Sequence, residues 1–179
     1  MLRVIVAGSR GITDPLIVNP ALDQALAGYS VMEFEIVSGM ADGPDILGKE
    51  WAEDRLVNVV EVPANTERFG GQATDLANGI MADISDAAIV FWDGQSHTSK
   101  RLINTAIEKG LVTLTIHSHR AVLQTLGESC VYRLDEIEPL TIPKRYGRID
   151  DYQPLIDAHW QEQPAVIVVP PPKWWPRKE

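Results

Sequence analysis

Short runs of apolar residues alternate with longer segments of helical periodicity over the first two thirds of the chain. The runs are rich in Val and Ile and show little alternation with polar residues. Such runs are typical of strands in a parallel sheet that is buried on both faces. We therefore predict five strands, at residues 2–7, 34–37, 57–62, 87–91 and 111–116.

The segments between these runs predict helices with one apolar face. Residues 99–110 carry an apolar stripe, and residues 75–83 form a further short helix. Gly110 is a natural stop because glycine readily adopts the left-handed conformation after a helix. A third helix spans residues 46–58, where the apolar positions are Ile46, Leu47, Trp51, Ala52 and Leu56.

The connection after the first strand contains two candidate helix starts, Asp14-Pro15 and Asn19-Pro20. A proline in the middle of a helix costs about 3 kcal/mol relative to alanine. We therefore expect an irregular turn first and a helix over residues 20–27.

Strict alternation of strands and helices predicts an α/β fold. We expect a Rossmann-like, doubly wound, five-stranded and mainly parallel sheet with helices on both faces, over residues 1–117. Residues 118–179 are predicted to form an irregular extension, with one further strand at 165–169 and an extended tail rich in proline and tryptophan at 170–179. Sheets of this class bind ligands beyond the carboxyl ends of their strands.

Charge and composition narrow the function. The 179-residue chain has a formal net charge of -9, which counts against non-specific binding of DNA or RNA. Its one cysteine, Cys130, allows no intrachain disulfide, and the first apolar run is too short for a signal peptide or a membrane span. We therefore expect a cytoplasmic protein. His117 and His119 could share a face but lack an evident third ligand, so no metal and no cofactor is predicted.

The first loop that could carry chemistry is Gly8-Ser9-Arg10-Gly11, directly after the first strand. Glycine lets backbone N–H groups approach an anion, Ser9 adds a hydroxyl, and Arg10 can bind phosphate oxygens with two parallel hydrogen bonds. The alternative is a tight turn with a solvated Arg10.

The second loop follows the second strand and leads into a helix. Gly39 and Gly43 again permit close approach, and Asp42 or Asp45 could bind ribose hydroxyls or act as a general base. Acidic residues at a helix start also stabilise the helix by capping and by favourable interaction with its dipole. Both interpretations of these acids stay open.

The third loop follows the fourth strand. Gly94 and the hydroxyls of Ser96, Thr98 and Ser99 lie at a predicted helix start. Lys100 and Arg101 fall in the first helical turn, where cations oppose the helix dipole unless an anion binds there or solvent screens them. We favour the anion.

A fourth segment, residues 67–72, precedes the short helix at 75–83. With Asn78 and Met81 on that helix it could form a pocket wall, or it is an ordinary loop and helix face.

These loops, in this order, resemble the SLOG superfamily, a Rossmann-like group that includes the core of DNA-processing protein A and the LOG phosphoribohydrolases. The branch with most similar loops is the YspA type. The resemblance covers roughly residues 2–116. The matching positions are 4–11, 36–39, Gly43, Asp45, Leu47, Gly48, Trp51, Ala52, Phe69, Gly70, Asn78, Met81, Ala82, Asp86, Ala87, 91–94, Ser96 and Ala106.

The resemblance implies a pocket for a nucleotide or a nucleotide-derived ligand and makes a homo-oligomer reasonable. Some family members are proposed to act as sensors or processors of such ligands in bacterial and phage conflict systems.

Several positions depart from the family pattern. Asp42 stands where the family usually has an arginine, and Pro44 where it has an alanine. Ala77 precedes Asn78 where an arginine is common. Two cations that would attract phosphate are therefore absent.

Two further departures lie after the fourth predicted strand. Thr98-Ser99 stands in place of a Gly-Thr pair, and Leu102 occupies the position of the catalytic glutamate of the LOG enzymes. On this comparison an essential carboxylate is missing, which weakens the case for cleavage of an N-glycosidic bond.

The leading hypothesis is a sensor, carrier or sequestering module for a small nucleotide-derived ligand. Phosphate would contact Gly8, Ser9, Arg10, Gly94, Ser96, Thr98, Ser99 and Lys100, while Gly39, Gly43 and Asp45, with Asn78 nearby, would line the sugar side.

Three alternatives stay open. The first is a hydrolase of an N-glycosidic or phosphate bond, with Asp45 as general base and Arg10 and Lys100 stabilising developing charge. The second is a module for single-stranded DNA that stacks bases on tryptophans such as Trp92, Trp174 and Trp175. The third is an interaction protein with a decayed pocket, whose tail docks on a partner.

Overall fold

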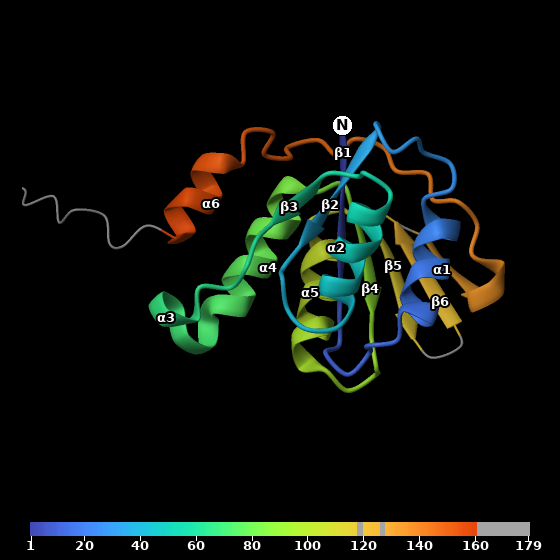
Figure 1. The fold of residues 1–179 in the computed structure, drawn as a ribbon, viewed down its shortest axis with the longest axis horizontal. Coiled ribbons are helices and arrows are strands. Elements are labelled where there is room, and N and C mark those ends of the chain that lie inside the picture. Colours follow the sequence, from blue (N-terminus) through green and yellow to red (C-terminus); the bar gives the residue numbers. More distant parts are fainter. Residues whose placement is uncertain (118–119, 126–127, 161–179) are drawn as a thin grey trace, which may run out of the picture.

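The computed structural model describes residues 1–117, 120–125 and 128–160, and these residues form one seven-stranded sheet in the order β3-β2-β1-β4-β5-β6-β7 (Figure 1). The first five strands run parallel. The strands are β1 (Leu2–Gly8), β2 (Phe34–Ser38), β3 (Val59–Glu61), β4 (Ala87–Phe91), β5 (Val112–His117), β6 (Arg120–Thr125) and β7 (Glu128–Arg133). The five predicted strands and the Rossmann-like α/β class are confirmed.

Helices cover both faces of the sheet because successive strand residues point to opposite sides. Val4 and Val6 of β1 face one core with α1 and α2, whereas Ile5 faces a second core with α4 and α5 (Figure 1). The helical elements are α1 (Pro15–Ala25), α2 (Pro44–Asp54), α3 (Thr66–Phe69), η1 (Gly70–Gln72), α4 (Ala73–Ile84), α5 (His97–Glu108), η2 (Leu134–Glu136) and α6 (Gln153–Trp160).

The prediction of five strands was too low, because a hairpin extends the sheet beyond β5. β6 pairs antiparallel with β5, and β7 with β6. β7 is exposed over most of its length, so its sequence lacks the buried apolar run that marks the other strands. The predicted domain boundary after residue 117 stays a prediction, although the sheet continues across it.

The predicted start of the first helix was also wrong. α1 begins at Pro15, with Asp14 as N-cap accepting a hydrogen bond from the Leu16 N–H at 2.9 Å, and it continues through Pro20. Leu16 and Pro20 both lie on the exposed side of α1, where water can satisfy the carbonyl that the proline ring leaves without a donor. The cost of Pro20 is offset by burial of Val18, Ala21 and Leu22 on the opposite side.

Residues after β7 return to the amino end of the central strands. The Asp86 carboxylate, fully buried before β4, accepts the backbone N–H groups of Arg3 at 2.9 Å and Arg145 at 2.7 Å and forms an ion pair with Arg148. Arg3 in turn donates to the Ile149 carbonyl at 2.9 Å. This part of the expected irregular extension is therefore anchored to the sheet.

The structure does not test two further predictions for the C-terminal residues. The strand expected at 165–169 and the tail at 170–179 lie outside the described residues. Among the residues that the structure describes, no helix is both long enough and apolar enough to span a bilayer.

Candidate functional site

The order of strands reverses between β1 and β4. From β1 the chain builds β2 and β3 to one side, and β4 then returns to the other side of β1. The loops that follow these two strands therefore diverge and leave a crevice at the carboxyl ends of the strands, which is where doubly wound sheets bind ligands.

A pocket of about 430 Å³ lies in this crevice. It collects residues from three loops and from α4 and α5. Its wall consists of Ala7, Gly8, Arg10, Gly11, Ala41, Asp45, Thr74, Asn78, Asp93, Ser96, Thr98, Ser99 and Leu102.

Seven of the twelve residues predicted to bind the ligand lie in this wall: Gly8, Arg10, Asp45, Asn78, Ser96, Thr98 and Ser99. The structure thus brings the three predicted loops together. Five predicted residues, Ser9, Gly39, Gly43, Gly94 and Lys100, lie beside the pocket without lining it.

Two glycines let the first loop pack closely on its neighbours. A Cβ atom at Gly8 would lie 2.3 Å from the Phe91 carbonyl oxygen. At Gly43, which has a φ of +89°, a Cβ would lie 3.1 Å from the Ser9 carbonyl oxygen. These glycines hold the loops after β1, β2 and β4 within contact distance.

Serine hydroxyls connect the first and third loops. Ser9 is buried, its Oγ accepts the Asp93 N–H at 3.1 Å, and it lies 3.3 Å from the Ser99 Oγ. Ser96 is the N-cap of α5, and its Oγ accepts the Ser99 N–H at 3.3 Å. These hydroxyls hold the loops in place, and Ser9 faces protein rather than the pocket.

Asp93 is part of the wall although the sequence did not single it out. Its Oδ1 accepts the N–H groups of Gln95 at 2.8 Å and Ser96 at 2.7 Å. These backbone hydrogen bonds, first that of Ser96, hold the pKa of the Asp93 carboxyl below its usual range. Asp93 is therefore a charged acceptor that already holds hydrogen bonds from two backbone N–H groups of its loop.

Asp45, the second residue of α2, is a buried carboxyl in the same pocket. It is 4% exposed, and its Oδ2 accepts the Gly8 N–H at 3.1 Å. Burial raises the pKa of Asp45 to about 7, against the lowering effect of backbone hydrogen bonds such as that from Gly8. Gly39 approaches this carboxyl so closely that a Cβ would lie 2.8 Å from the Asp45 Oδ1.

Other donors in the wall are unoccupied. Arg10 is exposed and has no hydrogen bond or ion pair with any described residue. The Asn78 side chain, 7% exposed, has an Nδ2 without an acceptor in the described part of the chain. The N–H groups of His97 and Thr98 at the start of α5 have no partner among the described residues either, as is usual for the first turn of a helix.

Lys100 and the segment at 67–72, both predicted to be near the ligand, do not line the pocket. The Lys100 Nζ lies 5.0 Å from the centre of the Trp92 ring. In the segment, Phe69 stacks on His159 of α6 with ring centres 5.0 Å apart. The pocket wall on this side comes instead from Thr74 and Asn78, and Thr74 could have been predicted because residues four apart share a face of a helix.

Histidines form no metal centre in the described residues. His117 lies with its ring 5.6 Å from that of Trp92, and His119 falls outside the described ranges. Within those ranges, no three His, Cys, Asp or Glu side chains gather as metal ligands.

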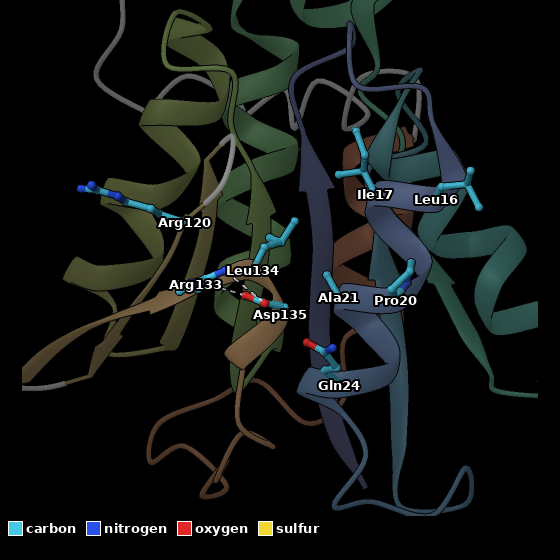
Figure 2. A pocket seen from close by; sticks show the side chains of 9 residues that line it. All are labelled: Leu16, Ile17, Pro20, Ala21, Gln24, Arg120, Arg133, Leu134 and Asp135. Carbon is cyan, nitrogen blue, oxygen red and sulfur yellow. Dashed lines mark hydrogen bonds and ion pairs between the residues drawn. The ribbon is translucent and has the colours of Figure 1, made fainter.

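A larger hollow, of about 580 Å³, lies between α1 and the β6–β7 hairpin (Figure 2). Leu16, Ile17 and Pro20 line one side, and Leu134 and the Arg133–Asp135 ion pair line the other (Figure 2). It contains none of the residues predicted to bind a ligand, so size alone does not identify the functional site.

The mainly parallel sheet, its reversal point and the polar pocket there define a Rossmann-like domain with a candidate ligand pocket. The family model described as "YspA, cpYpsA-related SLOG family" matches residues 2–69, so this segment of the chain is similar to that family. This match includes the loops after β1 and β2, and a similarity to this family suggests a nucleotide-related ligand. Searches of curated proteins and of solved structures found no match.

Proposed function

We propose that the pocket between β1 and β4 binds the phosphate group of a nucleotide or nucleotide-derived ligand, and that the protein is a sensor, carrier or sequestering module for it. The observation that supports this proposal is the Arg10 guanidinium, which has no partner in the described part of the chain and lies in the same wall as the first turn of α5. A guanidinium can bind two phosphate oxygens at once, and the start of a helix attracts negative charge.

The donors left free in the first turn of α5 suit an anion. The N–H groups of His97 and Thr98 need an acceptor, and the Thr98 hydroxyl lines the pocket beside them. A phosphate between this turn and Arg10 would satisfy these groups together. The local arrangement can attract an anion even though the whole chain has a net charge of -9.

The opposite wall suits the sugar of such a ligand. The Asn78 Nδ2 is a buried donor that has no acceptor among the described residues. Leaving a buried polar group unpaired costs about 1–3 kcal/mol, so a ligand acceptor here would be favourable. Asp45 in the same wall can accept a hydrogen bond from a ligand hydroxyl. Gly39 and Gly43 were predicted to line this side. Gly39 instead packs against the Asp45 carboxyl, and Gly43 packs against the backbone of the first loop.

Isothermal titration against a nucleotide panel that includes ADP-ribose and cyclic nucleotides tests the proposal. For a ligand that binds, Arg10→Gln should weaken the affinity tenfold or more, because a charge-assisted hydrogen bond contributes about 1.5–3 kcal/mol. Arg101→Gln is the matched control, since Arg101 is an exposed cation on α5 that pairs with Asp75 outside the pocket. The proposal is wrong if no member of the panel gives heat or a thermal shift, or if both variants bind like the wild type.

A second candidate is a hydrolase in which Asp45 is the general base. The observation that favours it is the Asp45 pKa of about 7, since a general base works best when its pKa is near the working pH. The apolar Leu102 lines the wall where LOG enzymes carry glutamate. Of the two carboxyls in the wall, Asp93 has a lowered pKa, so Asp45 is the candidate base.

Release of free base from nucleoside monophosphates or NAD-type compounds would demonstrate this activity. Asp45→Asn should then abolish turnover while the ligand still binds. Binding without release of base by the wild type would leave the binding module as the function.

A further inference from the structure

The pocket contains two carboxyl side chains that accept hydrogen bonds from backbone N–H groups near the proposed anion. Asp93 accepts the N–H groups of Gln95 and Ser96 through Oδ1 at 2.8 and 2.7 Å. Asp45 accepts the Gly8 N–H through Oδ2 at 3.1 Å. Both side chains line the same hollow as Arg10, so a ligand anion must enter beside them.

The two carboxylates differ in how well they tolerate charge. Asp93 is exposed to solvent at the mouth of the pocket. Asp45 is 4% exposed and makes no ion pair with any described residue. A buried carboxylate without a cation is costly, and a second negative charge in the same pocket raises that cost.

We propose that an anion binds this pocket together with one proton, which is taken up by Asp45. The proposal rests on the anion site proposed above and adds its regulation. The proton comes from solvent and forms an O–H bond on the Asp45 carboxyl. The neutral group can still accept the Gly8 N–H through its unprotonated oxygen.

The charged groups around Asp45 support this role. Arg10 from the loop after β1 and Asp93 from the loop after β4 line the same pocket as Asp45, whereas α4 contributes the neutral Thr74 and Asn78. On its own segment, Asp42 is exposed.

Lys49, one turn further along α2, does not neutralise Asp45, because its Nζ pairs with Glu61 at 2.7 Å and with Glu53 at 3.7 Å. Arg10 is therefore the one unpaired cation that the described pocket wall supplies for both Asp45 and an incoming anion. Burial brings the pKa of Asp45 to about 7, so the proton exchanges within the neutral range.

Calorimetric titration with inorganic sulfate tests the coupling, because sulfate keeps its charge across this pH range. We expect the wild type to bind sulfate about tenfold more tightly at about pH 6 than at about pH 8, as the neutral fraction of a group with a pKa near 7 changes by about that factor. Repeating the titration at about pH 8 in buffers of different ionisation enthalpy should show uptake of nearly one proton per sulfate. This second readout needs no substitution.

The variant Asp45→Asn mimics the neutral carboxyl. It should bind sulfate at pH 8 about as tightly as the wild type does at pH 6, without proton uptake. Asp42→Asn is the matched control for loss of one negative charge near the pocket, and His97→Gln controls for an exposed imidazole at the start of α5. Both controls should keep the pH dependence.

The outcomes separate the two proposals. Equal sulfate affinity of the wild type at both pH values, or a pH dependence that survives in Asp45→Asn and disappears in His97→Gln, would overturn the coupling and leave the anion site. No sulfate binding by the wild type or Asp45→Asn at either pH would remove the anion site itself.

Discussion

The Asp45 carboxylate accepts a hydrogen bond of 3.1 Å from the backbone N–H of Gly8, and this bond joins the start of α2 to the end of β1. The same contact places an ionisable group at the centre of the candidate site with almost no access to water. Stability, and under our proposal also anion binding, should therefore respond to the protonation of one side chain.

The first prediction concerns the pH dependence of stability. The folded-state pKa of Asp45, about 7, lies above its usual value of 3.8, so between these values the folded protein keeps a proton that the unfolded chain has lost. The contribution of Asp45 to stability therefore falls as the pH rises from about 4 to about 7 and stays low above that. Asp45→Asn removes this loss.

We expect the stability gain of Asp45→Asn over the wild type to be about 2 kcal/mol larger at pH 8 than at pH 5, an order-of-magnitude figure. Urea denaturation of both proteins at the two pH values measures it. Asp42→Asn, which changes an exposed carboxylate, should give equal differences at both. A gain that is independent of pH would show that Asp45 is ionised throughout.

The second prediction concerns two helical glycines. Gly48 packs α2 onto β1 so tightly that a Cβ would lie 2.5 Å from the Val6 Cγ1, whereas a Cβ at Gly79 in α4 would meet nothing within 4 Å. Gly48→Ala should destabilise the protein by about 1–3 kcal/mol through overpacking. Gly79→Ala should stabilise it by up to about 1 kcal/mol through helix propensity. Chemical denaturation of the pair checks the sign of each effect.

The third prediction concerns the ion pair of Asp86 and Arg148, whose side chains are 0% and 2% exposed. Asp86→Asn removes the buried counter-charge of Arg148 and leaves it only the exposed Asp150 carboxylate as an ion-pair partner, so it should cost up to about 3–5 kcal/mol. The Asp75–Arg101 pair is exposed on both sides, so Asp75→Asn should change stability by less than about 1 kcal/mol. Similar effects of the two substitutions in urea denaturation would contradict this ranking.

The fourth prediction concerns His159, which attaches α6 to the segment before α3. Its Nε2 accepts the Asn65 N–H at 3.3 Å, so the ring must be neutral at that nitrogen. Burial, and then the positive charge of Arg68, lower the pKa of His159 below 6.5. On acidification, His159 therefore takes up a proton more readily in the unfolded chain than in the folded protein. The stability that this contact contributes is fully present above about pH 6.5 and decreases as the pH falls below it.

Hydrogen exchange at the Asn65 amide, corrected for the intrinsic rate, should show less protection at pH 5 than at pH 7.5. His159→Gln should remove most of this difference, and His97→Gln, at an exposed histidine, should keep it. Constant protection across this range in the wild type would argue against a titrating contact.

The sequence predicted the parts of the fold that are held by local patterns. The strands around Val4, Ile36 and Ile89 are buried on both faces, so each appears as an apolar run, and Gly110 ends α5 with a φ of +77° as expected. The hairpin was not predicted because β6 is only partly buried and β7 is mostly exposed, so neither strand has a long buried apolar run. α1 was misplaced because the sequence shows the cost of Pro20 but not the burial that offsets it.

The candidate site was partly predictable for the same reason. Loops that follow buried parallel strands must meet at one edge, so the sequence could bring Arg10, Asp45 and Thr98 together. It could not show that Asp45 occupies the Gly8 amide, because that hydrogen bond joins residues 37 positions apart. The partners of Asp86 were equally hidden, since Arg148 lies 62 positions away.

The hydrogen bonds of Arg3 bear on how the chain is made. Its guanidinium donates to the carbonyls of Ile149 and Asp150, which follow it by 146 and 147 positions. Because a ribosome synthesises a chain from its N-terminal side, Arg3 is made 146 and 147 residues before those two carbonyls. The hydrogen bonds of this arginine in β1 are therefore completed late in synthesis of the domain, and a nascent chain that has not yet reached Ile149 lacks two of its acceptors.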